Sequence, residues 1–475
     1  MHTRQPSYPP FRPSLSFVLL CVVMIALFMA GGASRGDVPG QTVVRVVAWF
    51  ALIAIILFGD PPRLRQVRPV ALLLAATVVL AMLQLLPLPP AIWQVLPGRA
   101  LLTDAMIGSG QPQPWRPWTM TPGATANAAA SLIVPVVVLV LAAGLNQIDR
   151  ARLPGLMLCL VTASTLMGVI QFSGGGFDNP FINDSQGQVS GSFANRNHLA
   201  LFVALGCILA PAWAFPHTRR PGWRGPVALG LVLLFILTIL GTGSRAGLLL
   251  GGMALILSIG LVREVLRVML AGRPRWLAPA ILGIAGAGLI GLVVVSFRVN
   301  RAAAIDRVIQ LDPGQDMRQR GLPTVLAMVR DYFPAGSGLG SFDQMFRMHE
   351  PFSLLKLTYF NHAHNDFLEI ALDAGLAGVV LLIVSLFWWG LASVRAWKTR
   401  VNRPVLPQLG SGMILLILVA SAVDYPARTP MIMAVIVLAG VWLCETPRTD
   451  EMSGATGHSA TSDLPEMNAR ASASN

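Results

Sequence analysis

The chain has 475 residues, of which 54% are hydrophobic and 12% are charged, and its mean hydropathy is +0.64. This composition excludes an ordinary soluble protein and predicts an all-α polytopic membrane protein. The net charge of +13 would suggest nucleic-acid binding in a soluble protein, but here the basic residues lie between apolar segments, where they set membrane topology. We therefore expect membrane lipids, and no nucleic acid, as partners.

Apolar runs of about 20 residues recur along the chain and predict about twelve transmembrane helices. We expect these helices near residues 15–31, 43–59, 70–90, 126–144, 153–172, 197–215, 227–241, 247–262, 277–297, 366–390, 408–424 and 430–444. The chain then divides into four parts. Residues 1–297 hold about nine helices, residues 298–365 form a large, partly helical loop, residues 366–444 hold further helices, and residues 445–475 form a disordered tail.

Basic residues are distributed unequally between the two sides of the predicted membrane. With the N-terminus in the cytoplasm, the cytoplasmic loops hold many arginines and the opposite short loops hold few, so both termini are expected to be cytoplasmic. Two outward loops are long. Residues 111–124 are rich in proline and tryptophan, and residues 298–365 contain a helical pattern over residues 322–332.

The most informative stretch begins at His362 and leads from a polar loop into a long apolar run. If Asp366 caps the helix of this run, His364 lies at the helix mouth. If the helix reaches back to His364, Gly375 falls on nearly the same face, with Gly378 close to it. This face would offer a smooth seam for another helix or a long lipid chain.

Charged side chains at an outer membrane boundary usually have a partner, because an unpaired charge is costly to bury there. Arg196, Arg245 and Arg320 are the candidates on the same outward side as His364. Each has a simpler alternative, since an arginine can anchor a turn or extend to lipid headgroups.

Other polar residues of the outward side carry weaker signals. A lone loop histidine usually has no special role, so His362 and His198 are secondary candidates. Asp424 and Arg428 stand close together in one short outward turn and could form an ion pair that fixes it.

Arginines beside a histidine at a membrane surface suit transfer from a lipid-linked diphosphate. Arginines can bind the leaving diphosphate without a metal, and a neutral histidine can accept the proton of an incoming hydroxyl. No Asp-x-Asp pair precedes a helix in the outward loops, and the four cysteines lie in apolar runs. We therefore expect no metal site, no disulfide framework and no cofactor.

The spacing around His364 resembles a motif of the O-antigen ligase and polymerase superfamily of bacterial envelope glycosyltransferases. That motif is His followed by Asn, Ser or Gln, nine residues, Gly, two residues, and Gly, Thr or Tyr; His364, Asn365, Gly375 and Gly378 match it fully. Arg245 with a leucine four positions later matches a shorter motif. The glycine-rich residues 336–342 resemble the turn before the family's histidine, whereas the region of Arg196 departs from the pattern, with alanine four positions later. The resemblance extends over about residues 191–440.

The resemblance implies a multi-helix protein of the bacterial inner membrane whose large loop covers a periplasmic active site. The implied reaction is metal-independent, inverting transfer of a glycan from undecaprenyl diphosphate to an acceptor hydroxyl, first of all on lipid A-core. His364 would be the base, Arg196, Arg245 and Arg320 would hold the diphosphate, and Asn365, Gly375 and Gly378 would support the site.

Three alternatives remain open at this point. A polymerase would use a second lipid-linked repeat as acceptor, and a related ligase would use protein hydroxyls. A transporter for the same lipids, a different class, would predict ionisable residues within the spans and inverted repeats, and neither is evident in the sequence.

Overall fold

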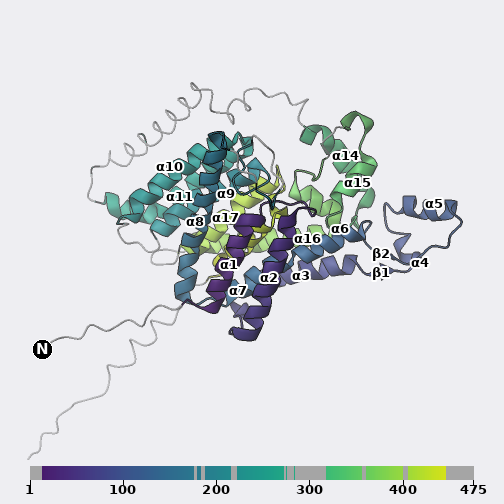
Figure 1. Ribbon diagram of the computed structural model, residues 1–475, viewed down its shortest axis with the longest axis horizontal. Coiled ribbons are helices and arrows are strands. Elements are labelled where there is room, and N and C mark those ends of the chain that lie inside the picture. Colours follow the sequence, from purple (N-terminus) through teal and green to yellow (C-terminus); the bar gives the residue numbers. More distant parts are fainter. Residues whose placement is uncertain are drawn as a thin grey trace, which may run out of the picture. The chain divides into compact units, whose positions relative to one another are not determined.

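Helices, most of them apolar, form nearly all of the described secondary structure in the computed structural model (Figure 1). The described residues are 13–175, 179–182, 188–215, 222–271, 274, 283, 317–355, 360–398 and 405–445. The predicted span at 277–297, apart from position 283, lies outside them. So do residues 298–316 of the predicted loop and the predicted tail beyond Glu445.

The long helices agree with the predicted membrane class. Those long and apolar enough to cross a bilayer are α2 (Pro39–Phe58), η1 with α3 (Leu64–Val67 and Arg68–Gln84), α6 with α7 (Pro122–Ser131 and Ile133–Ala143), α8 (Gln147–Phe172), α9 (Arg196–Ala214), α10 (Arg224–Thr242), α11 (Arg245–Leu270) and α16 (Asp366–Lys398). Shorter apolar helices are α1 (Leu15–Ala30), α17 (Leu406–Ser421) and α18 (Pro430–Leu443). The all-α polytopic fold is therefore confirmed, and the number of twelve spans stays a prediction.

The helix α9 is the centre of the helix packing. It contacts α8, α10, α11 and α17, and every residue from His198 to Ala212 is buried. Gly206 lets two neighbouring side chains approach closely, since a Cβ there would lie 2.6 Å from Val161 and 2.7 Å from Phe235. Small residues of α9, among them Ala200, Ala204 and Ala210, likewise leave room for close helix packing, which suits this segment to the interior of the bundle.

The outer helices instead expose apolar side chains. Phe50 and Phe58 of α2 are 69% and 78% exposed, although both are large and apolar. Such a surface is unfavourable in water and favourable in the hydrocarbon of a bilayer. The exposed face of α2 therefore faces lipid.

Residues 85–121 form a small lobe beyond the end of α3 (Figure 1). The lobe contains β1 (Pro87–Leu88), α4 (Pro90–Trp93), α5 (Ala100–Gly108) and β2 (Arg116–Pro117), and the two strands pair antiparallel. The prediction of a span to residue 90 and a loop over 111–124 was therefore wrong at its boundaries. Three prolines at positions 87, 89 and 90 end α3 early, because proline lacks the backbone N–H and clashes with the preceding turn.

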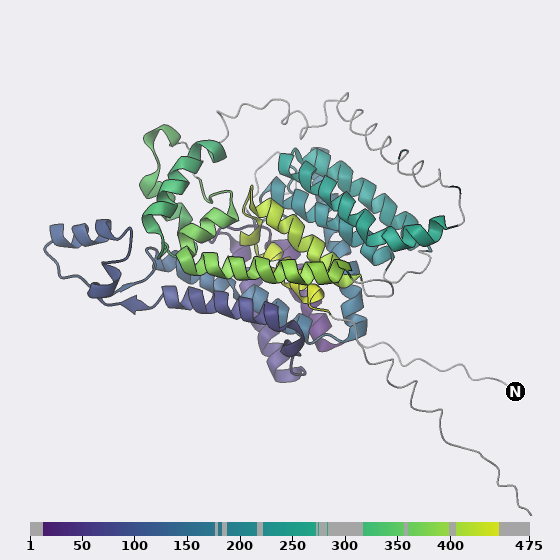
Figure 2. The ribbon, with the colours of Figure 1, turned by 180° about the vertical axis from the view of Figure 1, so that it is seen from behind.

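The predicted loop helix is confirmed and has its own small core. Helix α14 (Met317–Tyr332) packs with α15 (Phe342–His349) and the one-turn helix η3 (Phe352–Leu354) around buried Met328, Phe346 and Phe360. Figure 2 shows these elements beside the N-terminal end of α16. The described part of the loop is thus a packed helical layer and not an extended connection.

Helix α16 is interrupted at Gly375, which corrects the predicted continuous helix. Gly375 has φ 56° and ψ −144°, a conformation that favours glycine, and a Cβ there would lie 2.1 Å from the carbonyl oxygen of Pro334. The glycine-rich segment pairs with the break: Gly338 N–H donates to the Asp373 carbonyl (2.8 Å), and Leu376 N–H donates to Pro334 (2.9 Å). His364 also has a positive φ of 50° outside the helix. The expected common helix face of His364, Gly375 and Gly378 is therefore absent.

Hydrogen bonds hold both the lobe and the glycine-rich segment next to the interruption of α16 at Gly375. Gln84, the last residue of α3, donates to the Asp373 carbonyl (3.0 Å) and accepts from Leu339 N–H (2.9 Å). Arg99 of the lobe donates to the carbonyls of Trp118 (2.7 Å) and Gly336 (2.9 Å). These contacts fix the start of α16 from several sides.

Candidate functional site

His364 is held by a carboxylate that is 60 residues away in the sequence. Its Nδ1 lies 3.0 Å from Oδ1 of Asp424, which follows α17, and the two side chains are 16% and 3% exposed. A carboxylate accepts hydrogen bonds, so Nδ1 carries the proton and Nε2 keeps its lone pair. His364 is thus oriented to accept a proton at Nε2.

Asp424 is itself surrounded by donors. Its Oδ2 accepts from Asn197 at 2.5 Å and from Asn195 at 3.4 Å, both at the start of α9, and Arg318 of α14 lies 3.5 Å away. Burial alone raises the pKa of Asp424, but the hydrogen bond from His364 and the charge of Arg318 lower it well below its usual range. Asp424 is therefore ionised over the whole physiological pH range.

The ring of Tyr425 contacts the rings of three histidines. Its ring centre lies 4.2 Å from that of His362, 4.9 Å from that of His364 and 5.0 Å from that of His198. His198 is buried, and neither of its nitrogens has a hydrogen-bond partner within the described residues. His362 instead bonds through both nitrogens, to Glu369 (2.9 Å) and to Ser34 (3.0 Å).

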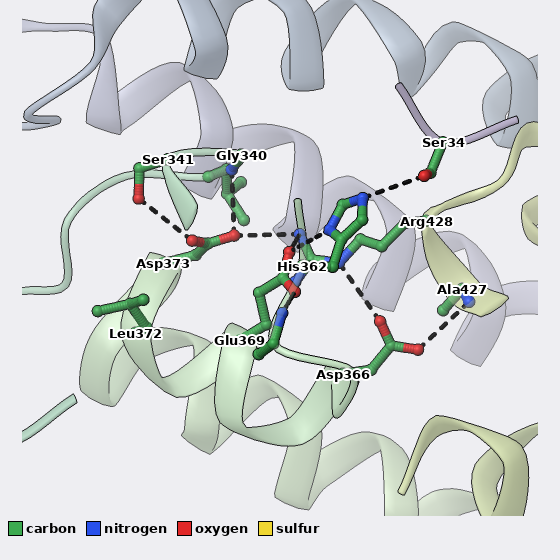
Figure 3. Close-up of polar contacts among 12 residues, drawn as sticks. Ser34, Gly340, Ser341, His362, Asp366, Glu369, Leu372, Asp373, Ala427 and Arg428 are labelled. Carbon is green, nitrogen blue, oxygen red and sulfur yellow. Dashed lines mark hydrogen bonds and ion pairs between the residues drawn. The ribbon is translucent and has the colours of Figure 1, made fainter. Parts of the chain in front are cut away.

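Three carboxylates of α16 converge on Arg428, which belongs to the one-turn helix η4 (Pro426–Arg428) (Figure 3). The Arg428 nitrogens lie 3.0 Å from Asp373, 3.4 Å from Asp366 and 3.5 Å from Glu369, and these carboxylates are at most 4% exposed. Burial alone lowers the pKa of Arg428, but the carboxylates raise it above its usual range. The ion pair that Asp424 and Arg428 could form is absent, because each side chain has partners from other parts of the fold.

The cap of α16 also differs from the prediction. The side-chain oxygen of Asn365 accepts from the N–H groups of Phe367 and Leu368, both at 3.0 Å, so Asn365 caps the helix. The Asn365 amide nitrogen donates to the Ala422 carbonyl at 2.9 Å. Asp366, which we expected as the cap, is instead buried against Arg428 and accepts from Ser421 at 2.7 Å.

The predicted arginines lie at different places on this side of the molecule. Arg196 begins α9, between the two asparagines that bind Asp424. Arg245 begins α11, where Gly247 packs against Ala200 of α9, so the two helix starts are neighbours. Arg320 donates to the Ser353 carbonyl at 2.9 Å.

Arg318, which was not among the predicted site residues, donates to the Val423 carbonyl at 3.0 Å and lies beside Asp424. Arg318 and Arg320 stand two positions apart on α14, so they point to different sides of the helix. Which of them faces Asp424 depends on the rotation of α14 in the fold, and no local signal in the sequence gives that rotation.

Gly378 does not line an open groove of the kind that was predicted for a helix or a lipid chain. A Cβ there would lie 2.4 Å from Ala374 of the same helix. Among the described residues, no group of three or more His, Cys, Asp or Glu side chains is arranged to hold a metal ion.

The fold and the site define a polytopic α-helical membrane protein with a histidine–carboxylate site where loops meet the helix ends. Residues 229–383 match the family model described as O-antigen ligase, which supports the predicted place in the O-antigen ligase and polymerase superfamily. Members of this family are membrane glycosyltransferase-like enzymes. The matched segment includes Arg245, His364 and Gly375 and ends before Asp424. The chain matches no curated protein.

Proposed function

We propose that the protein is an O-antigen ligase-like glycosyltransferase. It would move a glycan from undecaprenyl diphosphate to a hydroxyl of lipid A-core at the periplasmic face of the bacterial inner membrane. The observation that carries the proposal is the His364–Asp424 pair, because a buried, ionised carboxylate orients the one histidine that the family motif also selects. The glycan and the acceptor are inferences from the family match.

The chemistry follows from the two nitrogens of His364. Nδ1–H donates to Asp424, so Nε2 accepts the proton of the acceptor hydroxyl as its oxygen bonds to the anomeric carbon. The bond between that carbon and the diphosphate oxygen breaks, and the diphosphate leaves with the electron pair. Asp424 stabilises the imidazolium that forms, as the carboxylate of a Ser-His-Asp triad does. Attack on the face opposite the diphosphate inverts the configuration.

Arginines would hold the departing diphosphate. Arg196 and Arg245, at the neighbouring starts of α9 and α11, remain the candidates, and two helix N-termini favour an anion in the same region. Within α14, the contacts favour Arg318 over Arg320, because Arg318 lies against Asp424 while Arg320 binds the loop carbonyl of Ser353.

Purified protein in liposomes with a lipid-linked glycan tests the function. One sample contains lipid A-core and the other contains no acceptor. Product that forms only with lipid A-core supports the ligase, and longer lipid-linked chains without it indicate the polymerase. Donor that stays intact in both samples while labelled lipid crosses the bilayer would show a transporter and end the enzyme proposal.

The two arginines of α14 should respond differently in that assay. We expect Arg318→Gln to lower the rate of transfer about 10- to 100-fold, because it removes a charged donor beside the reacting groups. Arg320→Gln should have a much smaller effect, since it removes a contact to the Ser353 carbonyl. Initial rates at several donor concentrations measure both, and equal losses in the two variants would refute the preference for Arg318.

A further inference from the structure

A cavity of about 590 Å³ adjoins the site on the side of His362 that faces Ser34. Its walls come from the connection between α1 and α2, from α2, α3 and α6, and from the start of α15. His362 and Glu369 belong to its lining, whereas His364 does not. The volume is typical of a site that binds part of a substrate.

The uncharged polar side chains of the lining suit a sugar. They are hydroxyl or amide groups, which both donate and accept hydrogen bonds, as adjacent sugar hydroxyls require. Six of them are Ser34, Gln41, Thr77, Asn127, Gln344 and Asn361.

Arg45 gives the cavity a positive charge that no carboxylate of the described residues pairs with. It lies within α2, and its Nη2 donates to Gln41 Oε1 (3.4 Å) and to the Asn127 carbonyl (3.2 Å), which are neutral oxygens. Its Nε is buried without a hydrogen-bond partner. An arginine within a membrane helix usually marks a functional site and needs a counter-charge.

The other arginines of the lining differ from Arg45. Arg35 pairs with Asp37, and Arg347 pairs with Asp343 at 2.9 Å. Arg428 belongs to the cluster of three carboxylates. Among the arginines of the lining, Arg45 is therefore the one whose positive charge can pair with an anionic ligand.

A hydrogen-bond chain through Glu369, His362 and Ser34 forms another part of the lining, as Figure 3 shows. Glu369 accepts from His362 Nδ1 at 2.9 Å and from Ala363 N–H at 3.0 Å, and it is only 1% exposed. His362 Nε2 lies 3.0 Å from the Ser34 hydroxyl, and in the neutral ring, with its proton on Nδ1, Nε2 accepts from that hydroxyl. The Ser34 oxygen keeps its own lone pairs for a ligand hydroxyl.

We propose that this cavity binds an anionic sugar, one that carries a phosphate or a carboxylate, from one of the two glycan substrates. Arg45 binds the anionic group, and the amide and hydroxyl side chains bind the ring hydroxyls. The inference rests on the proposed function and adds the class of sugar. Tyr425 forms the connection between the cavity and the reaction centre, because its ring contacts both His362 and His364.

Binding without turnover tests the proposal on the full-length protein in nanodiscs. The probes are the water-soluble oligosaccharide from deacylated lipid A-core, the same oligosaccharide after removal of its phosphates and reduction of its carboxylates to alcohols, and the glycan released from the lipid-linked donor by mild acid. Calorimetric titration should show tighter binding, by about 10-fold or more, for an anionic probe than for its uncharged counterpart. The probe that binds identifies the source as acceptor or donor, and no binding of any probe overturns the proposal.

Matched variants locate the binding. Arg45→Gln should remove most of the preference for the anionic probe, and Arg45→Lys should keep it in large part. Gln344→Glu places a negative charge on an exposed position of the lining, so it should weaken anionic binding without harming the fold. Arg330→Gln, on the exposed face of α14, is the control and should bind as the unaltered protein does.

The result also separates this proposal from the proposed function. If Arg45→Gln and Gln344→Glu both bind the anionic probe as tightly as the unaltered protein, the cavity is not the site, even when transfer activity is found. If the probes bind through Arg45 and the liposome assay shows no transfer, the cavity proposal holds and the transferase proposal fails.

Discussion

His364→Ala is expected to lower the rate of glycan transfer about 100- to 10,000-fold, because a general base contributes a factor of this size. The protein should still fold, since His364 is only partly buried and the start of α16 is held by the Asn365 cap and the Arg428 cluster. Initial rates in liposomes with saturating acceptor measure the loss. The control is His349→Ala, which replaces another histidine of the same loop and should leave the rate unchanged.

Asp424→Asn should lower the rate of glycan transfer by a similar factor, but for a different reason. Asparagine keeps the shape but removes the charge that fixes the tautomer of His364 and stabilises the imidazolium, so kcat should fall while KM for the donor changes little. Asp424 acts through His364 and is therefore a positioning residue. Normal kcat in Asp424→Asn, or normal activity in His364→Ala, would remove the pair from the mechanism.

The lowered pKa of Asp424 also predicts how stability depends on pH. Ionised Asp424 stabilises the folded protein fully above the unfolded pKa of about 3.8, and this contribution disappears only as the pH falls through the lower folded value. Asp424→Asn should therefore lower the apparent melting temperature by the same amount from pH 5 to pH 8. A difference that changes within this interval would mean that another group titrates with Asp424.

Arg428→Met is expected to destabilise the protein by about 3–5 kcal/mol, because it leaves buried carboxylates without their shared cation. Asp366, Glu369 and Asp373 would then lie together within the fold without the arginine that they share. Their hydrogen bonds to Ser421, His362 and Ser341 would remain, but none of these contacts replaces the guanidinium. Thermal unfolding in detergent, followed by size-exclusion chromatography, measures the loss.

Two further variants test the cause of that loss. Arg428→Met combined with Asp366→Asn and Asp373→Asn should recover part of the stability, because two of the buried charges are removed with the cation. Arg347→Ala, which breaks an exposed pair with Asp343, should cost at most about 0.5 kcal/mol. A melting temperature for Arg428→Met equal to that of Arg347→Ala would contradict the structural role of the cluster.

The sequence by itself determined the class of protein, the approximate positions of the apolar helices within the described residues, the helix in the large loop and the choice of His364 as the candidate base. These features are local: a run of apolar residues is long enough to span a bilayer or it is not, and the motif from His364 to Gly378 lies within fifteen consecutive positions. Hydropathy and spacing therefore identify them without knowledge of the fold.

Only the tertiary structure decided the partners of these residues. Asp424 pairs with His364 and not with Arg428, Arg318 and not Arg320 lies against Asp424, and Gly375 breaks the helix that it was expected to line. Arg45 became significant only when its neighbours proved to be neutral. Each outcome depends on how remote helix ends pack and on how each helix is rotated, and these follow from the burial of the whole helix set around α9, which no single stretch of the sequence specifies.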